Sequence, residues 1–279
     1  MKRAATLSAL VCLLAVTAAA PASPDTGRGN GGHGSRHGSL LDSVPKAGVL
    51  KVCTTGDYRP FTHLDPKDKT YSGIDIKMAE DLAESLDAKP KYVATTWANL
   101  TKDVAAGRCD IAVGGVSITL PRARQVYFSE PTREDGKTPI VRCADKEKFG
   151  EGTLADIDKA GTTVIVNPGG TNEQFARAHI KQATIKQHPE NTTIFQEIIE
   201  GRADVMMTDA SETRYQAKIH PELCSLHPDK PFTFSEKAYA LPRGDEEFKE
   251  YVDQFTHLAT HDGTYAGYEA EWMGAPSGS

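Results

Sequence analysis

Apolar and polar positions follow two alternating periods from residue 40 onward. Short apolar runs at residues 49–54, 91–94 and 110–113 predict strands. Between them, at residues 76–86 and 100–106, apolar residues recur every three or four positions, which is helical spacing. Strands joined by crossover helices predict a parallel sheet that is covered on both faces.

The same pattern starts again in the second half of the chain. Strands are expected at residues 163–166, 183–186 and 204–207, with helices at residues 173–179 and 192–200. A second α/β unit of similar size predicts a protein with two lobes.

The remainder of the chain has a strand-like run at residues 237–241 and a helical stretch at residues 245–259. It is too short for a third domain, so we expect it to pack on the first unit. Lobe one is then residues 42–136 plus 232–279, and lobe two is residues 137–231. The chain would cross twice between the lobes at a hinge, and the strand ends would face each other across a cleft.

The N-terminal part of the chain predicts export. Residues 1–22 have the order of a cleaved signal peptide, with basic residues, an apolar run and then small residues. The apolar run is too short to span a membrane, and no later segment approaches the ~20 apolar residues of a membrane helix. Residues 23–41 are rich in Gly and Ser and predict a flexible tail, in which His33 and His37 are solvated rather than metal-bound. We therefore expect a periplasmic or secreted protein with no membrane insertion after cleavage.

Composition and charge narrow the function. The chain has 279 residues, of which 39% are hydrophobic and 25% charged, and its formal net charge is -6. This composition is globular, and the lack of a basic stripe argues against a nucleic-acid partner. No Ser-His-Asp arrangement, metal-ligand cluster or Walker loop is visible, so we expect neither a metal nor another cofactor. The sequence leaves open the oligomeric state and the glycosylation of the sequons at Asn99 and Asn191.

The loop after the third predicted strand, residues 114–122 (GGVSITLPR), has the composition of an anion site. Its glycines allow backbone N–H groups to approach a ligand. Ser117 and Thr119 add hydroxyl groups, and Arg122 supplies a planar fork suited to a carboxylate. The alternative for Arg122 is a surface ion pair, which the surrounding glycines and hydroxyls make the less favoured interpretation.

Lobe two offers a matching loop in the sequence NPGGTNE. Gly170, Thr171 and Asn172 are predicted to form an anion site at the start of a helix. The alternative is an ordinary capped helix in which Glu173 merely favours the helix dipole, and spacing alone leaves both open.

Further candidates follow other predicted strands. Asp209 comes after an apolar strand and is predicted to pair with a ligand ammonium group, with helix N-capping as the alternative. Tyr58, Phe61 and Trp97 lie in loops at strand ends and are candidates for the wall of an apolar ring site. Core packing is the commoner role for any one of these aromatic residues.

The segment GGVSITLPRARQVYFSEP resembles the amino-acid-binding branch of the periplasmic solute-binding proteins, as do TTGDYRPF and MMTDA. The resemblance implies an α/β fold of the two-lobed, type II periplasmic-binding-protein kind, with a hinge and an interlobe cleft. It also implies that Arg122, with Ser117 and Thr119 beside it, binds the α-carboxylate of a ligand. Asp209 is then the partner of the α-ammonium group.

A closer resemblance, to the cyclohexadienyl dehydratases, covers roughly residues 42–260 and rests on DGKTPI, NPGGTNEQFARA, GRADVMMTDA, HPELC and EKAYALPR. That family has the solute-binding fold and converts prephenate to phenylpyruvate and L-arogenate to L-phenylalanine. The resemblance implies that Glu173 is the general acid and that Lys137, in DGKTPI, binds substrate. Thr132 and Pro121 depart from the family pattern, but neither touches the proposed acid.

The implied chemistry sets an expectation for Glu173. A general acid must be protonated near neutral pH, so burial in a closed, dry cleft should raise the pKa of Glu173. The alternative function is an amino-acid-binding protein of a transport or sensing system. The acid at Glu173 is the feature that separates the two functions.

Export permits disulfides among the cysteines that remain once Cys12 is removed with the signal. We expect one bridge, Cys143–Cys224, because both ends of lobe two should run near the hinge. Cys53 and Cys109 are expected to remain thiols, because they should lie at opposite ends of parallel strands, on the order of 10 Å apart.

Overall fold

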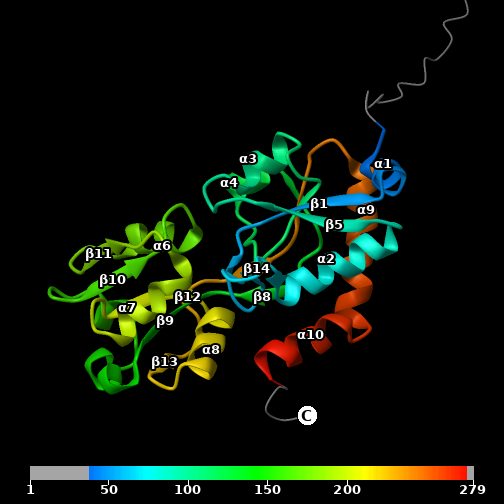
Figure 1. Ribbon diagram of the computed structural model, residues 1–279. Helices are drawn as coiled ribbons and strands as arrows, with labels where there is room; N and C mark the ends of the chain where they lie inside the picture. Colours follow the sequence, from blue (N-terminus) through cyan, green and yellow to red (C-terminus); the bar gives the residue numbers. More distant parts are fainter. Residues whose placement is uncertain (1–37, 275–279) are drawn as a thin grey trace, which may run out of the picture. The chain divides into compact units, whose positions relative to one another are not determined.

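The computed structural model describes residues 38–274, in which two five-stranded sheets each form the centre of a lobe (Figure 1). The predicted signal peptide (1–22) and most of the predicted tail (23–41) lie outside the described residues. Within residues 38–274, no helix is both long enough and apolar enough to cross a membrane.

Lobe one is built on a sheet of strand order β5-β1-β6-β15-β7. Its strands are β1 (Val49–Thr54), β5 (Lys89–Ala94), β6 (Ile111–Ala112), β7 (Tyr127–Phe128) and β15 (Ala240–Leu241). β1 runs parallel to β5 and β6, as predicted, but β15 runs antiparallel to β6 and β7. The prediction of a parallel sheet is therefore wrong at this edge, because the chain enters β15 on its return from lobe two and in the reverse direction.

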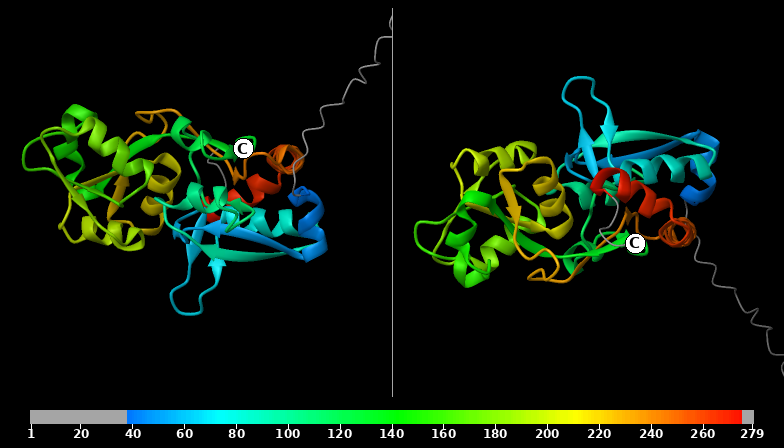
Figure 2. Two further views of the ribbon diagram at one scale, coloured as in Figure 1. Left: turned by 90° about the horizontal axis from the view of Figure 1, so that it is seen from above. Right: turned by 90° about the horizontal axis from the view of Figure 1, so that it is seen from below.

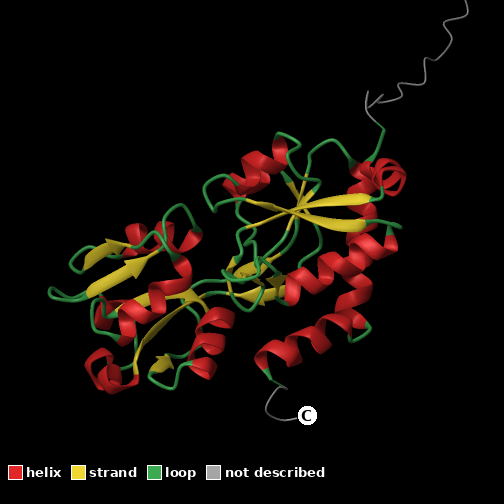
Figure 3. Ribbon diagram, in the orientation of Figure 1, coloured by secondary structure: helices red, strands yellow, loops and turns green. Residues whose placement is uncertain are grey.

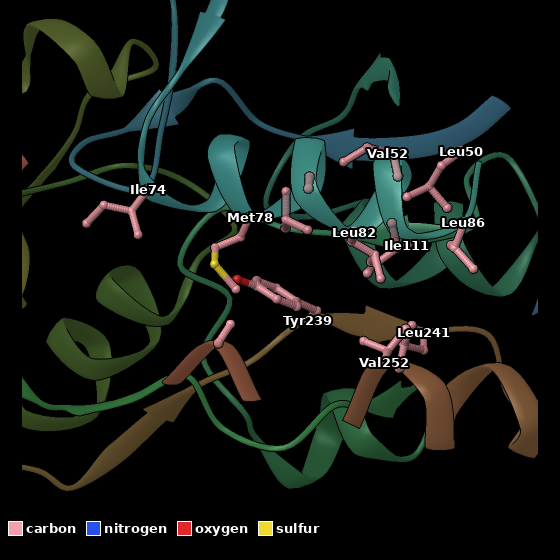
Figure 4. Packing of buried hydrophobic residues seen from close by; sticks show 14 of the residues in the cluster. Leu50, Val52, Ile74, Met78, Leu82, Leu86, Ile111, Tyr239, Leu241 and Val252 are labelled. Carbon is pink, nitrogen blue, oxygen red and sulfur yellow. The ribbon is translucent and has the colours of Figure 1, made fainter. Parts of the chain in front are cut away.

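Helices cover both faces of this sheet because residues along β1 alternate between two cores. The helices are α1 (Leu40–Ala47), α2 (Ile74–Ser85), α3 (Leu100–Ala105), α4 (Leu120–Ala123), α9 (Glu246–His261) and α10 (Thr264–Met273). Leu50 and Val52 belong to the core shared with α2 and α9, whereas Cys53 belongs to the core under α3. Figure 4 shows the first core, where Met78 and Leu82 of α2 meet side chains from the returning chain.

The helix α1 begins inside the segment that was predicted to be a flexible tail. The Ser39 hydroxyl accepts a hydrogen bond from the Leu41 N–H (3.1 Å) and donates one to Asp245 (2.6 Å), the residue before α9. The Gly- and Ser-rich composition of the residues before them places residues 39–41 in the predicted tail. They are instead a capped helix start that is tied to lobe one.

The chain between β1 and α2, where no strand was predicted, contains a small three-stranded sheet. It consists of β2 (Asp57–Tyr58), β3 (Thr62–Leu64) and β4 (Tyr71–Ser72). The β3–β4 hairpin projects from lobe one in both views of Figure 2. Strands of two or three residues give too short a pattern for alternation to be recognised.

Lobe two is also built on a five-stranded sheet, with the strand order β11-β10-β12-β9-β13. Its strands are β9 (Lys137–Arg142), β10 (Thr163–Val166), β11 (Thr184–Gln187), β12 (Val205–Asp209) and β13 (Leu223–Ser225). Its helices are η1 (Cys143–Phe149), α5 (Leu154–Ile157), α6 (Thr171–His179), η2 (Asn191–Thr193), α7 (Ile194–Ile199) and α8 (Ala210–Ile219). β10 is parallel to β11 and β12, so their carboxyl ends lie at one edge of the sheet.

The lobes are joined by a ribbon of two antiparallel strands, β8 (Arg133–Asp135) and β14 (Ser235–Lys237), visible between the two sheets in Figure 3. Beyond β14 the chain packs on lobe one through α9 and α10. The helix α10 also contacts lobe two, because Lys218 Nζ in α8 donates to the carbonyl oxygen of Trp272 (3.0 Å). The exact lobe boundaries, after residue 136 and before residue 232, stay a prediction.

Each lobe contains one disulfide. Cys143–Cys224 is present, as predicted, and joins the end of β9 to its neighbour β13. The expectation that Cys53 and Cys109 remain thiols is wrong, because these two residues form the second disulfide, with Cα atoms 5.6 Å apart.

The error over Cys109 has a local cause. The expectation treated residue 109 as the start of an extended strand, but β6 begins only at Ile111 and the chain bends at Arg108 and Asp110. Cys109 therefore does not continue the line of the strand away from Cys53. Both cysteines lie in the same buried cluster under α3.

Candidate functional site

A small cavity lies between the two lobes. Its lining residues are Tyr58, Trp97, Gly115, Ser117, Asn167, Gly170, Thr171, Asn172 and Asp209. Most of the residues predicted to bind a ligand are therefore in this lining. Thr119 and Lys137 line an adjoining hollow that shares Ser117 and Thr171 with the cavity.

Beside this cavity the two lobes contact each other through hydrogen bonds. The Tyr58 hydroxyl of lobe one donates to Asp209 Oδ2 of lobe two (2.5 Å). Asn191 Nδ2 of lobe two donates to the carbonyl oxygen of Asp57 in lobe one (2.9 Å). The sequon side chain at Asn191 is thus buried in the contact between the lobes.

The glycines of the lobe-one loop are required by close packing. Gly115 has φ +71°, and a Cβ atom there would lie 2.5 Å from Cδ2 of Phe61. The N–H groups of Gly114 and Gly115 donate to Asp75 Oδ2 (3.0 and 2.7 Å), so they do not face the cavity as predicted. Burial raises the pKa of Asp75 to about 6, against the lowering effect of these bonds and of Tyr239.

Arg122 is not among the residues that line the cavity, but it contacts two that are, Ser117 and Trp97. Its Nη1 donates to the carbonyl oxygen of Ser117 (2.9 Å), and its guanidinium carbon lies 5.9 Å from the centroid of the Trp97 ring. Within residues 38–274 it forms no ion pair, so the alternative of a surface ion pair is not found. Thr119 caps α4 by accepting from the Arg122 N–H (3.3 Å), which fixes the start of the helix that carries the arginine.

Two aromatic side chains form one wall of the cavity. The rings of Tyr58 and Trp97 meet edge to face, with centroids 5.4 Å apart. Trp97 Nε1 donates to Asp57 Oδ1 (3.1 Å), which fixes the orientation of the indole ring. Phe61 stacks behind Tyr58 and is fully buried, so it has the core role rather than the wall role.

Asp209 is the centre of a buried charge cluster. Oδ1 accepts from Lys137 Nζ (2.8 Å), while Oδ2 accepts from Tyr58 and also from Lys237 Nζ. The exposed fractions of Asp209, Lys137 and Lys237 are 2%, 5% and 1%. Burial raises the pKa of Asp209, but the two lysines outweigh burial and hold this pKa well below its usual range. Asp209 occupies the N-cap position of α8, but its side chain makes no capping bond.

Lys137 connects this cluster to the start of α6. Its Nζ also donates to Thr171 Oγ1 (3.0 Å) and to Asn172 Oδ1. Burial lowers the pKa of Lys137, and the nearby charge of Asp209 opposes that shift. Gly170 takes the N-cap position of α6, and no side chain makes a capping bond there.

Glu173 does not have the environment that its predicted role required. It accepts hydrogen bonds from the Gly169 N–H (2.7 Å), from Arg177 Nε (2.8 Å) and from Gln187. These bonds, with the Gly169 N–H first, lower the pKa of Glu173, whose side chain is 15% exposed. The expectation of a raised pKa is therefore wrong in this structure, because Glu173 is ion-paired and is not in a dry pocket. Its role as general acid stays a prediction.

Lys237 and Glu212 lie at the site but were not among the predicted residues. Lys237 Nζ donates to Ser117 Oγ (2.8 Å) and lies 5.4 Å from the Tyr58 ring centroid, so it reaches the site from the hinge strand β14. Glu212, in the first turn of α8, is buried and accepts from Thr208 Oγ1 (2.6 Å). Burial raises the pKa of Glu212 to about 8, so its carboxyl group is mostly protonated at neutral pH. Lys237 carries no local sequence signal because its partner Ser117 is distant in the chain, and the pKa of Glu212 depends on burial, which a local motif does not show.

Comparison with known protein families and sequences identifies relatives of the whole described chain. Residues 50–275 match the family described as bacterial extracellular solute-binding proteins, family 3. A cyclohexadienyl dehydratase of Pseudomonas aeruginosa is 54% identical over 235 residues, which cover 84% of this chain and 86% of that protein. The L-cystine-binding protein TcyJ of Escherichia coli is 25% identical over 237 residues, which cover 85% of this chain and 86% of that protein.

Solved structures of the same kinds of protein have a similar fold. An ancestral amino-acid-binding protein, described as a precursor of cyclohexadienyl dehydratase, matches with a TM-score of 0.77 and 34% identity. The match covers 84% of this chain and 100% of that one. An ancestral cyclohexadienyl dehydratase matches with 48% identity and a TM-score of 0.54, over 85% of this chain and 97% of that one. Both comparisons extend across the two lobes and the cavity between them.

Proposed function

This chain belongs to the family 3 bacterial extracellular solute-binding proteins, and we propose that it is an enzyme of that family. The proposed reaction is a decarboxylating dehydration that converts prephenate to phenylpyruvate and L-arogenate to L-phenylalanine. The observation that carries the proposal is a cavity with an aromatic wall, whose lining residue Asp209 is paired with two buried lysines, Lys137 and Lys237. Such a site suits a compact ring that carries carboxylates. The similarity to a named cyclohexadienyl dehydratase supports it.

The reaction needs little covalent chemistry from the protein. The ring carboxylate leaves as carbon dioxide, and the electron pair of the broken C–C bond moves into the ring. The C–O bond to the ring hydroxyl breaks at the same time, and a donated proton turns the departing group into water. Because the ring becomes aromatic, the protein has to supply only a proton and a pose in which both groups can leave.

The residues in and beside the cavity have distinct roles in this proposal. Arg122 binds a substrate carboxylate, with Ser117 and Thr119 beside it. Tyr58 and Trp97 lie along the ring. Glu173 donates the proton, and Lys137 contacts the substrate together with Gly170, Thr171 and Asn172 at the start of α6. Exclusion of water by the touching lobes strengthens every polar contact inside.

Proton donation by Glu173 needs a change from the described arrangement. Its carboxylate must leave Arg177 and take up a proton, since the ion pair favours the charged form. Glu173 follows directly after three residues that line the cavity, so a change of side-chain rotamer is sufficient to alter its surroundings. The alternative function, an amino-acid-binding protein of a transport or sensing system, is disfavoured because Asp209 is already paired with two lysines.

Export also belongs to the proposal. We place a cleaved signal peptide at residues 1–22 and the mature protein in the periplasm or outside the cell. The two disulfides support this assignment, because such bonds persist in oxidising compartments.

The test is turnover by the purified, disulfide-bonded protein. Prephenate is added at neutral pH, and formation of phenylpyruvate is followed by its ultraviolet absorbance. The control is the same solution without protein, because prephenate also rearranges slowly by itself. A rate equal to that of the control, together with tight binding of an amino acid, would favour the transport or sensing function instead.

A further inference from the structure

Asp209 is the acidic residue in the cavity lining, and a ligand ammonium group would need it as a partner. Both of its oxygens are occupied by groups of the protein. Oδ1 faces Lys137 Nζ at 2.8 Å, and Oδ2 faces both the Tyr58 hydroxyl and Lys237 Nζ. An incoming ammonium group would therefore compete with two ammonium groups for one carboxylate.

The lysines themselves are fixed in place. Lys137 Nζ has an acceptor for each of its three N–H bonds, namely Asp209, Thr171 and Asn172. Lys237 Nζ donates to Asp209 and to Ser117, and it is 1% exposed. Neither side chain can turn away to solvent and leave Asp209 free without breaking buried hydrogen bonds.

The charges around the cavity do not cancel. Lys137 and Lys237 share one carboxylate, that of Asp209. Asp135, a further buried carboxylate near Lys137, is itself paired with Arg133. Glu212, one turn behind Asp209 in α8, adds little negative charge at neutral pH because burial raises its pKa to about 8. Positive charge that is not cancelled beside the cavity favours a ligand with two carboxylates over one that also carries an ammonium group.

We propose that Lys137 and Lys237 make this cavity selective for a 2-oxo dicarboxylate over the otherwise identical 2-amino acid. This inference rests on the proposed function and deepens it, because the two proposed substrates differ only in that group. The 2-oxo acid brings two negative charges and no positive one. The 2-amino acid brings an ammonium group that meets like charges and has no unoccupied carboxylate to bind.

The first measurement needs no substitution. The kcat/KM values of the parent protein for prephenate and L-arogenate are compared at neutral pH and moderate salt. We expect a preference for prephenate of at least about tenfold, because like charges placed together in a binding site cost that much or more. Equal values, or a preference for L-arogenate, would overturn the inference while leaving the proposed function intact.

Two substitutions then test the lysines. In Lys237→Met the side chain keeps its approximate size, and Asp209 Oδ2 loses a cation. We expect the preference for prephenate to fall by about tenfold, with kcat/KM decreasing for prephenate and holding or increasing for L-arogenate. Lys137→Met should act in the same direction through Oδ1, and it keeps the test decisive if Lys237→Met does not fold. A merely structural role would lower both values together and leave their ratio unchanged, which would overturn the inference.

Controls separate charge from general damage. Lys237→Arg keeps the positive charge and should keep the preference. Lys51→Met removes a lysine that pairs with Asp110 on lobe one (3.1 Å), away from the cavity, and should leave both kcat/KM values near those of the parent.

A binding measurement separates this inference from the proposed function. Calorimetric titration of the parent protein with phenylpyruvate and with L-phenylalanine compares a 2-oxo acid with its 2-amino counterpart without any turnover. We expect phenylpyruvate to bind at least about tenfold more tightly. If it does so while prephenate is not converted, the reaction is wrong and the selectivity stands. If L-phenylalanine binds as tightly or more tightly, the selectivity is wrong whatever the turnover.

Discussion

The two lobes contribute different kinds of surface to the same cavity. Lobe one presents an aromatic wall, Tyr58 and Trp97, and a loop held by the buried Asp75. Its guanidinium group at Arg122 is charged at any physiological pH. Lobe two presents the first turns of α6 and α8, where carboxyl and ammonium groups lie within hydrogen-bond distance of one another.

Within lobe two, two glutamates show that a position at the start of a helix does not determine whether a carboxyl group is protonated. Glu173 and Glu212 each lie in the first turn of a lobe-two helix. Glu173 is held by Gly169 and Arg177, which lower its pKa, whereas burial raises the pKa of Glu212 to about 8. Lobe one is thus suited to shape and charge recognition, and lobe two to proton chemistry.

Glu173→Gln should have the largest effect. It keeps the size of the side chain but removes the acidic proton, so we expect kcat to fall by about 10²-fold or more with KM changed little. The matched control is Glu212→Gln in the first turn of α8, whose carboxyl group is already mostly neutral. That variant should keep kcat within a few-fold of the parent. If the two variants changed places in a steady-state assay, the acid would have to be reassigned to Glu212.

Arg122→Ala tests the lobe-one side of the comparison. Loss of a charge-assisted contact with a carboxylate should raise KM by roughly 10- to 100-fold, with a smaller effect on kcat. Arg124→Ala, an exposed arginine just after the same short helix, is the control and should behave like the parent. A variant that binds prephenate normally but turns it over slowly would remove Arg122 from the binding role.

Arg177→Gln tests the ion pair of Glu173 through the pH dependence of kcat/KM. Glu173 must carry a proton, so activity is lost as the pH rises through its pKa. Arg177 lowers that pKa, and its removal should move the falling limb of the profile upward by roughly half a unit. Arg202→Gln is the control, because Arg202 also pairs with a glutamate of lobe two and is similarly exposed. An unchanged or downward-shifted limb would contradict the assignment.

The smallest effect concerns the two disulfides. Cys53 and Cys109 are buried in lobe one, whereas Cys143 and Cys224 are partly exposed in lobe two. Mild reduction of the native protein should therefore open Cys143–Cys224 first, with little loss of activity, because the reductant reaches only that bond. Thiol alkylation followed by peptide mass spectrometry measures the order. Labelling of Cys53 before Cys143 would show that lobe one opens more readily than lobe two.

The sequence predicted most regular elements because their apolar patterns are strong. The expected strands at residues 49–54 and 163–166 match β1 and β10, and the expected helix at residues 245–259 is nearly α9. The expected strand at residues 237–241 is in fact two strands, β14 in the hinge and β15 in lobe one. Periodicity finds an extended segment, but it does not show where that segment leaves one sheet for another.

The sequence predicted most of the residues that form the candidate site, but not their ion pairs or the pKa values of their carboxyl groups. Loops at strand ends brought Ser117, Thr171 and Asp209 to one cavity, because parallel strands end at the same edge of a sheet. The pairing of Asp209 with Lys237 depends on the hinge strand β14, 28 residues further along the chain. The pKa of a carboxyl group depends on such distant partners and on burial, so it cannot be inferred from a local motif.

The contact of α10 with lobe two has a mechanical consequence. Trp272 lies with its ring centroid 6.1 Å from that of Tyr215, and Lys218 holds the last turn of α10 by a bond to its carbonyl oxygen. Any swing of the lobes that widens the cavity must also slide one ring past the other and break that bond. Opening of the lobes is therefore coupled to the C-terminal helix, although this helix contributes no residue to the cavity lining.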